Sequence, residues 1–287
     1  MSAPAKLLAF AATLALLFAG GALAGDVLGP DRDSSAVARS EPEAGHGGAT
    51  EEHGERATHP VRGLAVAENG LRLVVDDVEL RRGRTEDVRF RIVDDAGSTV
   101  RDFDVEHEKR MHLIVARRDL TGFQHLHPEQ ANDGSWAVRV RLDEPGSYRL
   151  FADFSNQEEP YTLATDLRVD GDARLHPLPA PSPTSVSDGG YDVALDAGEA
   201  HPGAEANLKF TITKDGRPVE PEPYLGAGGH LVALREGDLA FLHVHPTEHD
   251  GAVAFAATFP TDGRYRLFLQ FKHEGRVQTV ALTQEVK

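Results

Sequence analysis

Short apolar segments that alternate with polar residues recur along most of the chain. LRLVVDDVEL (71–80), EDVRFRIVD (86–94) and SWAVRVRLD (135–143) are typical examples. An apolar residue at every second position is the pattern of a half-buried β-strand. Turn-forming stretches such as DDAGS, ANDGS and DEPGS separate the segments. Seven such segments between residues 63 and 173 predict an antiparallel β-sandwich over 63–173.

The same pattern returns after a proline-rich segment, RLHPLPAPSPTSVSDGG (174–190). Prolines donate no ladder hydrogen bond and favour extended linkers, so 174–190 is predicted to join two domains. HLIVAR (112–117) recurs as HLVALR (230–235), and GSYRLFADF (146–154) recurs as GRYRLFLQF (263–271). This internal repeat predicts a second sandwich over 191–287. The expected fold is all-β, with two tandem immunoglobulin-like or cupredoxin-like antiparallel sandwiches.

The first 62 residues have a different character. Lys6 precedes an uncharged run from Leu7 to Gly25, so 1–25 is predicted to be a hydrophobic helix that serves as a signal peptide or an uncleaved membrane anchor. Residues 26–62 are rich in Asp, Glu, Ser and Gly and contain three histidines, which predicts a disordered spacer. In both cases the rest of the chain is expected outside the cytoplasmic membrane, either anchored or secreted.

Composition removes several classes of function. The net charge of −16 argues against a nucleic-acid partner. The chain has no cysteine, which excludes disulfides, thiolate zinc sites, iron–sulfur clusters and a blue-copper centre. Any bound metal must therefore use nitrogen, oxygen or thioether ligands.

Each repeat carries three histidines at one spacing: His112, His125 and His127, then His230, His243 and His245. Strand residues two apart share a face, so the last two of each set should project together. A hairpin loop with an even number of residues would bring His112 across from His127, whereas an odd loop would send it to the other face. Neutral imidazole suits Cu(II), Zn and Ni. The spacing predicts one three-His site per repeat for a divalent ion, copper more than zinc.

Other polar positions do not follow the repeat. Asp153 in the first copy corresponds to Gln270 in the second, and Met111 corresponds to Gly229. The position of Asp153 and Gln270 therefore does not hold a carboxylate in both copies. His107, in VEHEKR, is expected to lie in a solvated loop.

Two other interpretations stay open. The histidines could be structural, tying neighbouring loops together by their ring N–H groups, in a module that binds another envelope protein. A three-His metalloenzyme is the weakest alternative, since it also needs an open coordination position and a general base. The sequence contains no G-x-S-x-G, P-loop or dinucleotide fingerprint, so no enzymatic activity is expected.

MHLIVARRDLTGFQHLHPE, GSYRLFADF and LGAGGHLVALREGDLAFLHVHP resemble a family of exported actinobacterial proteins of unassigned function with tandem cupredoxin-like or YtkA-like β-sandwich domains. The resemblance covers residues 70–287. It implies a membrane-anchored or secreted protein that handles copper or another heavy metal. Together with the histidine spacing, it predicts an extracytoplasmic metal-binding protein that acts in sequestration or delivery.

Overall fold

The predicted β-strands form throughout the region that the structure describes. The computed structural model describes residues 61–242, 244–247 and 253–287. Within these ranges there is no helix, and so none that is long and apolar enough to cross a membrane. The predicted leader over 1–25 and all of the predicted spacer except residues 61 and 62 lie outside the described residues. All the described residues belong to one unit, Glu55–Lys287.

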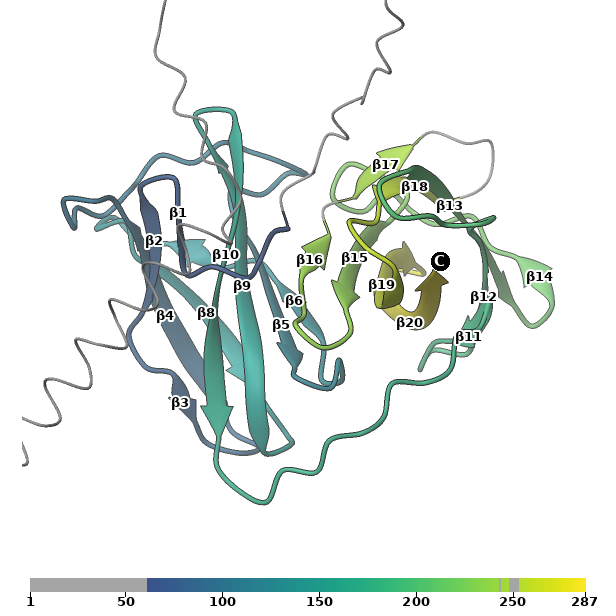
Figure 1. Cartoon of the computed structure of the whole chain (residues 1–287), viewed down its shortest axis with the longest axis horizontal. Coiled ribbons are helices and arrows are strands. Elements are labelled where there is room, and N and C mark those ends of the chain that lie inside the picture. Colours follow the sequence, from purple (N-terminus) through teal and green to yellow (C-terminus); the bar gives the residue numbers. More distant parts are fainter. Residues whose placement is uncertain (1–60, 243, 248–252) are drawn as a thin grey trace, which may run out of the picture. The chain divides into compact units, whose positions relative to one another are not determined.

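The first sandwich consists of two five-stranded sheets, ordered β1-β2-β4-β8-β7 and β3-β10-β9-β5-β6. Figure 1 shows β9 and β10 as the long antiparallel pair of the second sheet. The strands are β1 (Ala67–Glu68), β2 (Leu71–Val75), β3 (Glu79–Leu80), β4 (Thr85–Val93), β5 (His112–Arg117), β6 (Gln124–Leu126), β7 (Glu129–Gln130), β8 (Trp136–Arg141), β9 (Gly146–Asn156) and β10 (Glu159–Val169).

The second sandwich pairs a sheet ordered β11-β12-β13-β18-β17, with β14 beside β13, with a sheet ordered β16-β15-β19-β20. Its strands are β11 (Thr184–Val186), β12 (Tyr191–Asp196), β13 (Glu205–Lys214), β14 (Arg217–Pro218), β15 (His230–Arg235), β16 (Phe241–Leu242), β17 (His245–Thr247), β18 (Val253–Thr258), β19 (Gly263–His273) and β20 (Arg276–Val286). The order β6-β5-β9-β10 in the first sandwich matches β16-β15-β19-β20 in the second, which confirms the internal repeat. Strand β11 lies within the proline-rich segment 174–190 and pairs with β12.

Each sandwich has its own core, built by the alternation that the sequence displays. In β4 the side chains of Val88, Phe90 and Ile92 are buried, while Arg89 between them is exposed. They pack with residues of the facing sheet, among them Leu150 and Leu163. In the second sandwich, strands of both sheets likewise contribute to one apolar cluster. Burial of these alternate faces is the main force that holds each pair of sheets together.

A third apolar cluster joins the outer faces of one sheet from each sandwich. Strand β5 is buried on both faces, because Leu113 and Val115 enter the first core while Ile114 and Ala116 point outward. Such two-sided burial is typical of a continuous apolar run such as HLIVAR. We call the cluster the inter-sandwich core; it comprises Ile114, Ala116, Leu120, Phe151, Ala164, Val232, Leu234, Leu239, Phe241 and Phe268.

Candidate metal centre

The hairpin formed by β5 and β6 sets the position of the first histidine group. Its connection, residues 118–123, has six residues between the two strands. Leu113 pairs with Leu126 and Ile114 pairs with His125, so the same register places His112 opposite His127. This is the even-loop arrangement that sequence analysis required for convergence. All three histidines lie on the outer face of the sheet, together with Ile114 of the inter-sandwich core.

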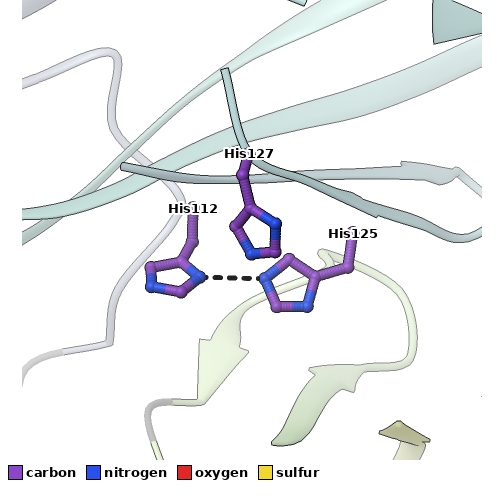
Figure 2. A group of neighbouring side chains, drawn as sticks. All are labelled: His112, His125 and His127. Atoms are coloured by element: carbon purple, nitrogen blue, oxygen red, sulfur yellow. Dashed lines mark hydrogen bonds between the residues drawn. The ribbon is translucent and has the colours of Figure 1, made fainter. Parts of the chain in front are cut away.

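The rings of His112, His125 and His127 turn toward one another (Figure 2). One nitrogen from each ring lies within 4.8 Å of the other two. The ring centroids are 5.3 Å apart for His112 and His125, 5.1 Å for His112 and His127, and 4.9 Å for His125 and His127. His112 is buried and the other two are half-buried. The first predicted triad is therefore a real cluster of side chains.

Outer hydrogen bonds fix which nitrogen of two rings carries the proton. His112 Nε2 lies 3.2 Å from the carbonyl oxygen of Glu106, and His125 Nδ1 lies 2.8 Å from Gln270 Oε1. Gln270 Nε2 donates to Thr279 Oγ1, which orients the amide so that its oxygen faces His125. A carbonyl oxygen only accepts, so both ring nitrogens must be donors.

The other nitrogens of these two rings, His112 Nδ1 and His125 Nε2, face each other; we call them the inner nitrogens. His112 Nδ1 and His125 Nε2 are 3.0 Å apart, the dashed contact in Figure 2. In neutral rings whose protons lie on the outer nitrogens, both inner nitrogens present lone pairs. Two opposed lone pairs need a shared proton or a cation between them. This arrangement is therefore suited to a positive ion.

Burial keeps these imidazoles neutral. It lowers the pKa of His112, lowers the pKa of His125 well below 6.5, and lowers the pKa of His127 to about 4. Repulsion from neighbouring histidine rings adds to the effect of burial on the pKa of His125 and His127. Asp153, which pairs with His112 on the adjacent strand, has its pKa raised by burial and accepts a hydrogen bond of 2.6 Å from Thr162 Oγ1. The site is a neutral donor set at physiological pH.

The stability of the metal-free protein should depend on pH for the same reason. Below pH 6.5 the histidines of the unfolded chain bind protons, whereas the folded chain binds the proton at His127 only near pH 4. The unfolded state therefore binds more protons in this window, and the free energy of unfolding should fall as the pH falls from 6.5 to 4. Urea unfolding at a series of pH values, without metal, measures this slope. A His125→Gln/His127→Gln variant should have a shallower slope, and an unchanged slope would contradict the account.

A fourth histidine of the predicted set, His230, lies beside this triad. It begins β15 and pairs with Gln270 on β19, just as His112 pairs with Asp153. Its ring centroid is 5.8 Å from that of His112 and 5.8 Å from that of His125. Of the predicted partners of His230, His243 lies outside the described residues, and for His245 only the backbone, in β17, is described.

Two residues that sequence analysis did not assign to the site also belong to its surroundings. His107, expected in a solvated loop, is half-buried in the turn before β5, and its ring centroid is 4.8 Å from that of His230. Gln270 supplies the second-sandwich hydrogen bond to His125. The departure from the repeat at Asp153 and Gln270 was the available sequence signal. A cavity of about 40 Å³ adjoins the rings and is lined by His107, His112, Ile114, His125, Asp153, His230, Leu231, Val232, Phe241, Leu242 and Val244.

The ring centroids of the triad are spaced like those of imidazoles around one metal ion. Imidazoles bound at about 2.0 Å to a tetrahedral ion have ring centroids about 5.2 Å apart, and the three observed separations span 4.9 to 5.3 Å. Two ligand nitrogens lie about 2.8 Å apart in square-planar geometry and about 3.3 Å apart in tetrahedral geometry. The 3.0 Å between His112 Nδ1 and His125 Nε2 falls between these values. The hydrogen bonds to Glu106 and Gln270 are of the kind that orients metal-binding histidines.

Two solved structures to which this chain is similar are only distantly so. The Escherichia coli adhesin FdeC is 16% identical, with a TM-score of 0.28 over 78% of this chain and 66% of that chain. Salmonella alpha-2-macroglobulin is 15% identical, with a TM-score of 0.28 over 80% of this chain and 15% of that chain. This chain thus spans less than two thirds of either protein, and such TM-scores support no functional comparison. A search of curated proteins finds no match.

A family model matches the chain twice. The model, described as "Domain of unknown function (DUF8832)", matches residues 65–171 and again residues 184–287. The first match spans the strands from β1 to β10, and the second spans those from β11 to β20. Together the two matches cover most of the described chain, so the protein belongs to the DUF8832 family and carries two copies of its domain.

Proposed function

We propose that this chain is an extracytoplasmic metal-binding protein that takes up a divalent ion, copper in preference to zinc, at His112, His125 and His127. Its role is sequestration or delivery of the ion, without catalytic turnover. The observation that carries the proposal is the 3.0 Å distance between His112 Nδ1 and His125 Nε2. The other nitrogen of each ring is hydrogen-bonded, to Glu106 for His112 and to Gln270 for His125. A cation bound by both lone pairs relieves their repulsion.

The preference for copper follows from the donor set. Imidazole nitrogen binds both Cu(II) and Zn(II), and for a given site of this kind Cu(II) binds more tightly. The triad offers three neutral nitrogens and leaves further positions for water or a fourth ligand. Met111 is buried in the first sandwich core, on the opposite face of β5 from His112, so the proposed ligand set contains no thioether.

Binding without turnover is supported by the size of the site. Cavities that hold organic substrates usually have volumes of about 300–1,000 Å³, whereas the cavity beside the triad measures about 40 Å³. It has room for an ion with about one water molecule. This small volume favours storage or transfer of an ion.

The location outside the cytoplasm rests on the sequence. The uncharged run from Leu7 to Gly25 after Lys6 has the character of an export signal or an anchor. Fractionation of cells that produce the full chain should find it in the membrane or outside the cell. Recovery from the cytoplasm would contradict this part of the proposal.

Gln270 should affect metal affinity although it does not bind the ion. Replacing it with leucine removes the acceptor that holds His125 Nδ1–H, so the ring loses its fixed tautomer and orientation. We expect Gln270→Leu to lower Cu(II) affinity by about 10-fold or more. Gln270→Glu keeps the acceptor oxygen and should retain more affinity than the leucine variant. Equal affinities for the wild type and the leucine variant would contradict this role.

The proposal as a whole is tested by metal titration of the full chain, purified without a His-tag and treated with a chelator. Isothermal titration with Cu(II) and Zn(II), with a weak competitor such as glycine in the copper experiment, should give saturable binding of both ions, tighter for Cu(II). Elemental analysis after desalting should find retained copper. If neither ion binds above the level of a denatured sample, the histidines are structural and the proposal fails.

A further inference from the structure

We infer that His230 of the second sandwich binds the same ion as His112, His125 and His127, so that the ion joins the two sandwiches. This inference rests on the proposed metal-binding function. The internal repeat predicts that His230 belongs to a second site; here His230 instead shares the site of the first triad.

The first observation is a pair of buried nitrogens without partners. Among the described residues, His127 Nε2 and His230 Nε2 are buried and have no hydrogen-bond partner. His230 Nε2 is therefore a buried nitrogen that no donor or acceptor among the described residues satisfies. In a neutral ring protonated at Nδ1, this nitrogen presents a lone pair that a cation beside the triad would satisfy.

The second observation is the position of the ring. The His230 centroid lies 5.8 Å from both His112 and His125, slightly farther than the 4.9 to 5.3 Å within the triad. Its nitrogens fall outside the 4.8 Å group, so coordination needs a small side-chain rotation toward the triad. The rings of His112 and His230 are nearly parallel, with an angle of 25° between their planes. The His230 side chain thus needs to move only a short distance to reach an ion bound by the triad.

The third observation is that the inter-sandwich core continues to the histidines. Ile114 and Val232 belong to that core and also line the cavity beside the rings. Phe268 of that core stacks on Phe123, with ring centroids 4.0 Å apart. His125 already reaches across to Gln270 of the second sandwich. An ion bound by rings from both sides would therefore add a further link across an interface that already has apolar packing and the hydrogen bond between His125 and Gln270.

The inference predicts that metal binding protects the second sandwich from opening. In hydrogen exchange of the full chain, saturating Cu(II) should slow exchange in β5 and β6 and also in β15. His230→Ala should still bind one ion through the triad, with affinity lowered by about 10-fold or more, and should lose the copper-induced protection of β15 while keeping that of β5. His201→Ala, an exposed histidine of the second sandwich, should behave as the wild type. His230→Gln serves as a second variant if the alanine variant does not fold.

The outcomes separate this inference from the proposed function. If the wild type binds no copper, the proposed function itself fails. If it binds copper and β15 is protected equally in His230→Ala, the ion does not join the sandwiches. Two ions per wild-type chain, with one lost in His230→Ala, would also overturn the inference, because His230 would then serve a separate site.

Discussion

Replacing His112 with alanine is expected to lower the Cu(II) affinity of the full chain by about 100-fold or more. His112 supplies one of the two opposed nitrogens, and its other nitrogen donates to the carbonyl of Glu106. Removing the His112 side chain takes away one metal ligand, so His125 Nε2 no longer has His112 Nδ1 opposite it to share the ion. Competition titration with a chromogenic copper chelator measures the change. His112→Ala/His125→Ala should leave no specific binding.

The matched control is a histidine that lies elsewhere. The side chain of His201 is 56% exposed and contacts the backbone oxygen of Lys287. His201→Ala should bind Cu(II) as tightly as the wild type. Equal losses in His112→Ala and His201→Ala would show that binding is a general property of surface histidines, and the site would have no special role.

Replacing Phe151 with alanine is expected to destabilise the protein by about 3–5 kcal/mol. Phe151 lies at the centre of β9, is 0% exposed and belongs to the inter-sandwich core. Its ring centroid lies 5.6 Å from that of Phe241 on the second sandwich. Gly63 also packs against it, so closely that a Cβ on Gly63 would lie 2.8 Å from the ring. The truncation leaves a cavity between Phe241 and Gly63. Because these neighbours belong to different parts of the fold, they cannot all move in to fill it.

Urea unfolding followed by tryptophan fluorescence and by circular dichroism measures this loss. Leu175→Ala is the control, since Leu175 is 63% exposed and should change stability by less than about 0.5 kcal/mol. If Phe151→Ala cost no more than the control, the packing between the two sandwiches would contribute nothing to stability. The histidine site beside the inter-sandwich core would then not be held in place by that packing.

The sandwiches and their duplication could be predicted from the sequence because both leave local marks. Alternation in β4 places Val88, Phe90 and Ile92 on one face, and a period of two identifies such a strand without any tertiary information. The register that brings His112 opposite His127 follows from the six-residue connection 118–123. The first triad was therefore within reach of sequence analysis.

The position of the second sandwich against that triad could not be predicted. The hydrogen bond from His125 to Gln270 joins residues 145 positions apart, and periodicity within a strand carries no information about such a contact. Repetition alone assigned His230 to a separate site. The continuous apolar run HLIVAR indicates a strand buried on both faces, but it does not identify what covers the outer face. Asp153 and Gln270 occupy equivalent positions in the two copies, but Asp153 accepts a hydrogen bond from Thr162 whereas Gln270 accepts one from His125 across the interface.

X-ray absorption at the copper edge, on the full chain loaded with one equivalent of Cu(II), tests the central claim most directly. The account predicts a first shell that includes at least three nitrogens at about 2.0 Å, with the outer-shell scattering of imidazole rings. This imidazole signal should fall sharply in His112→Ala/His125→Ala. A first shell of oxygen atoms without imidazole scattering, or a spectrum unchanged in the double variant, would contradict the account.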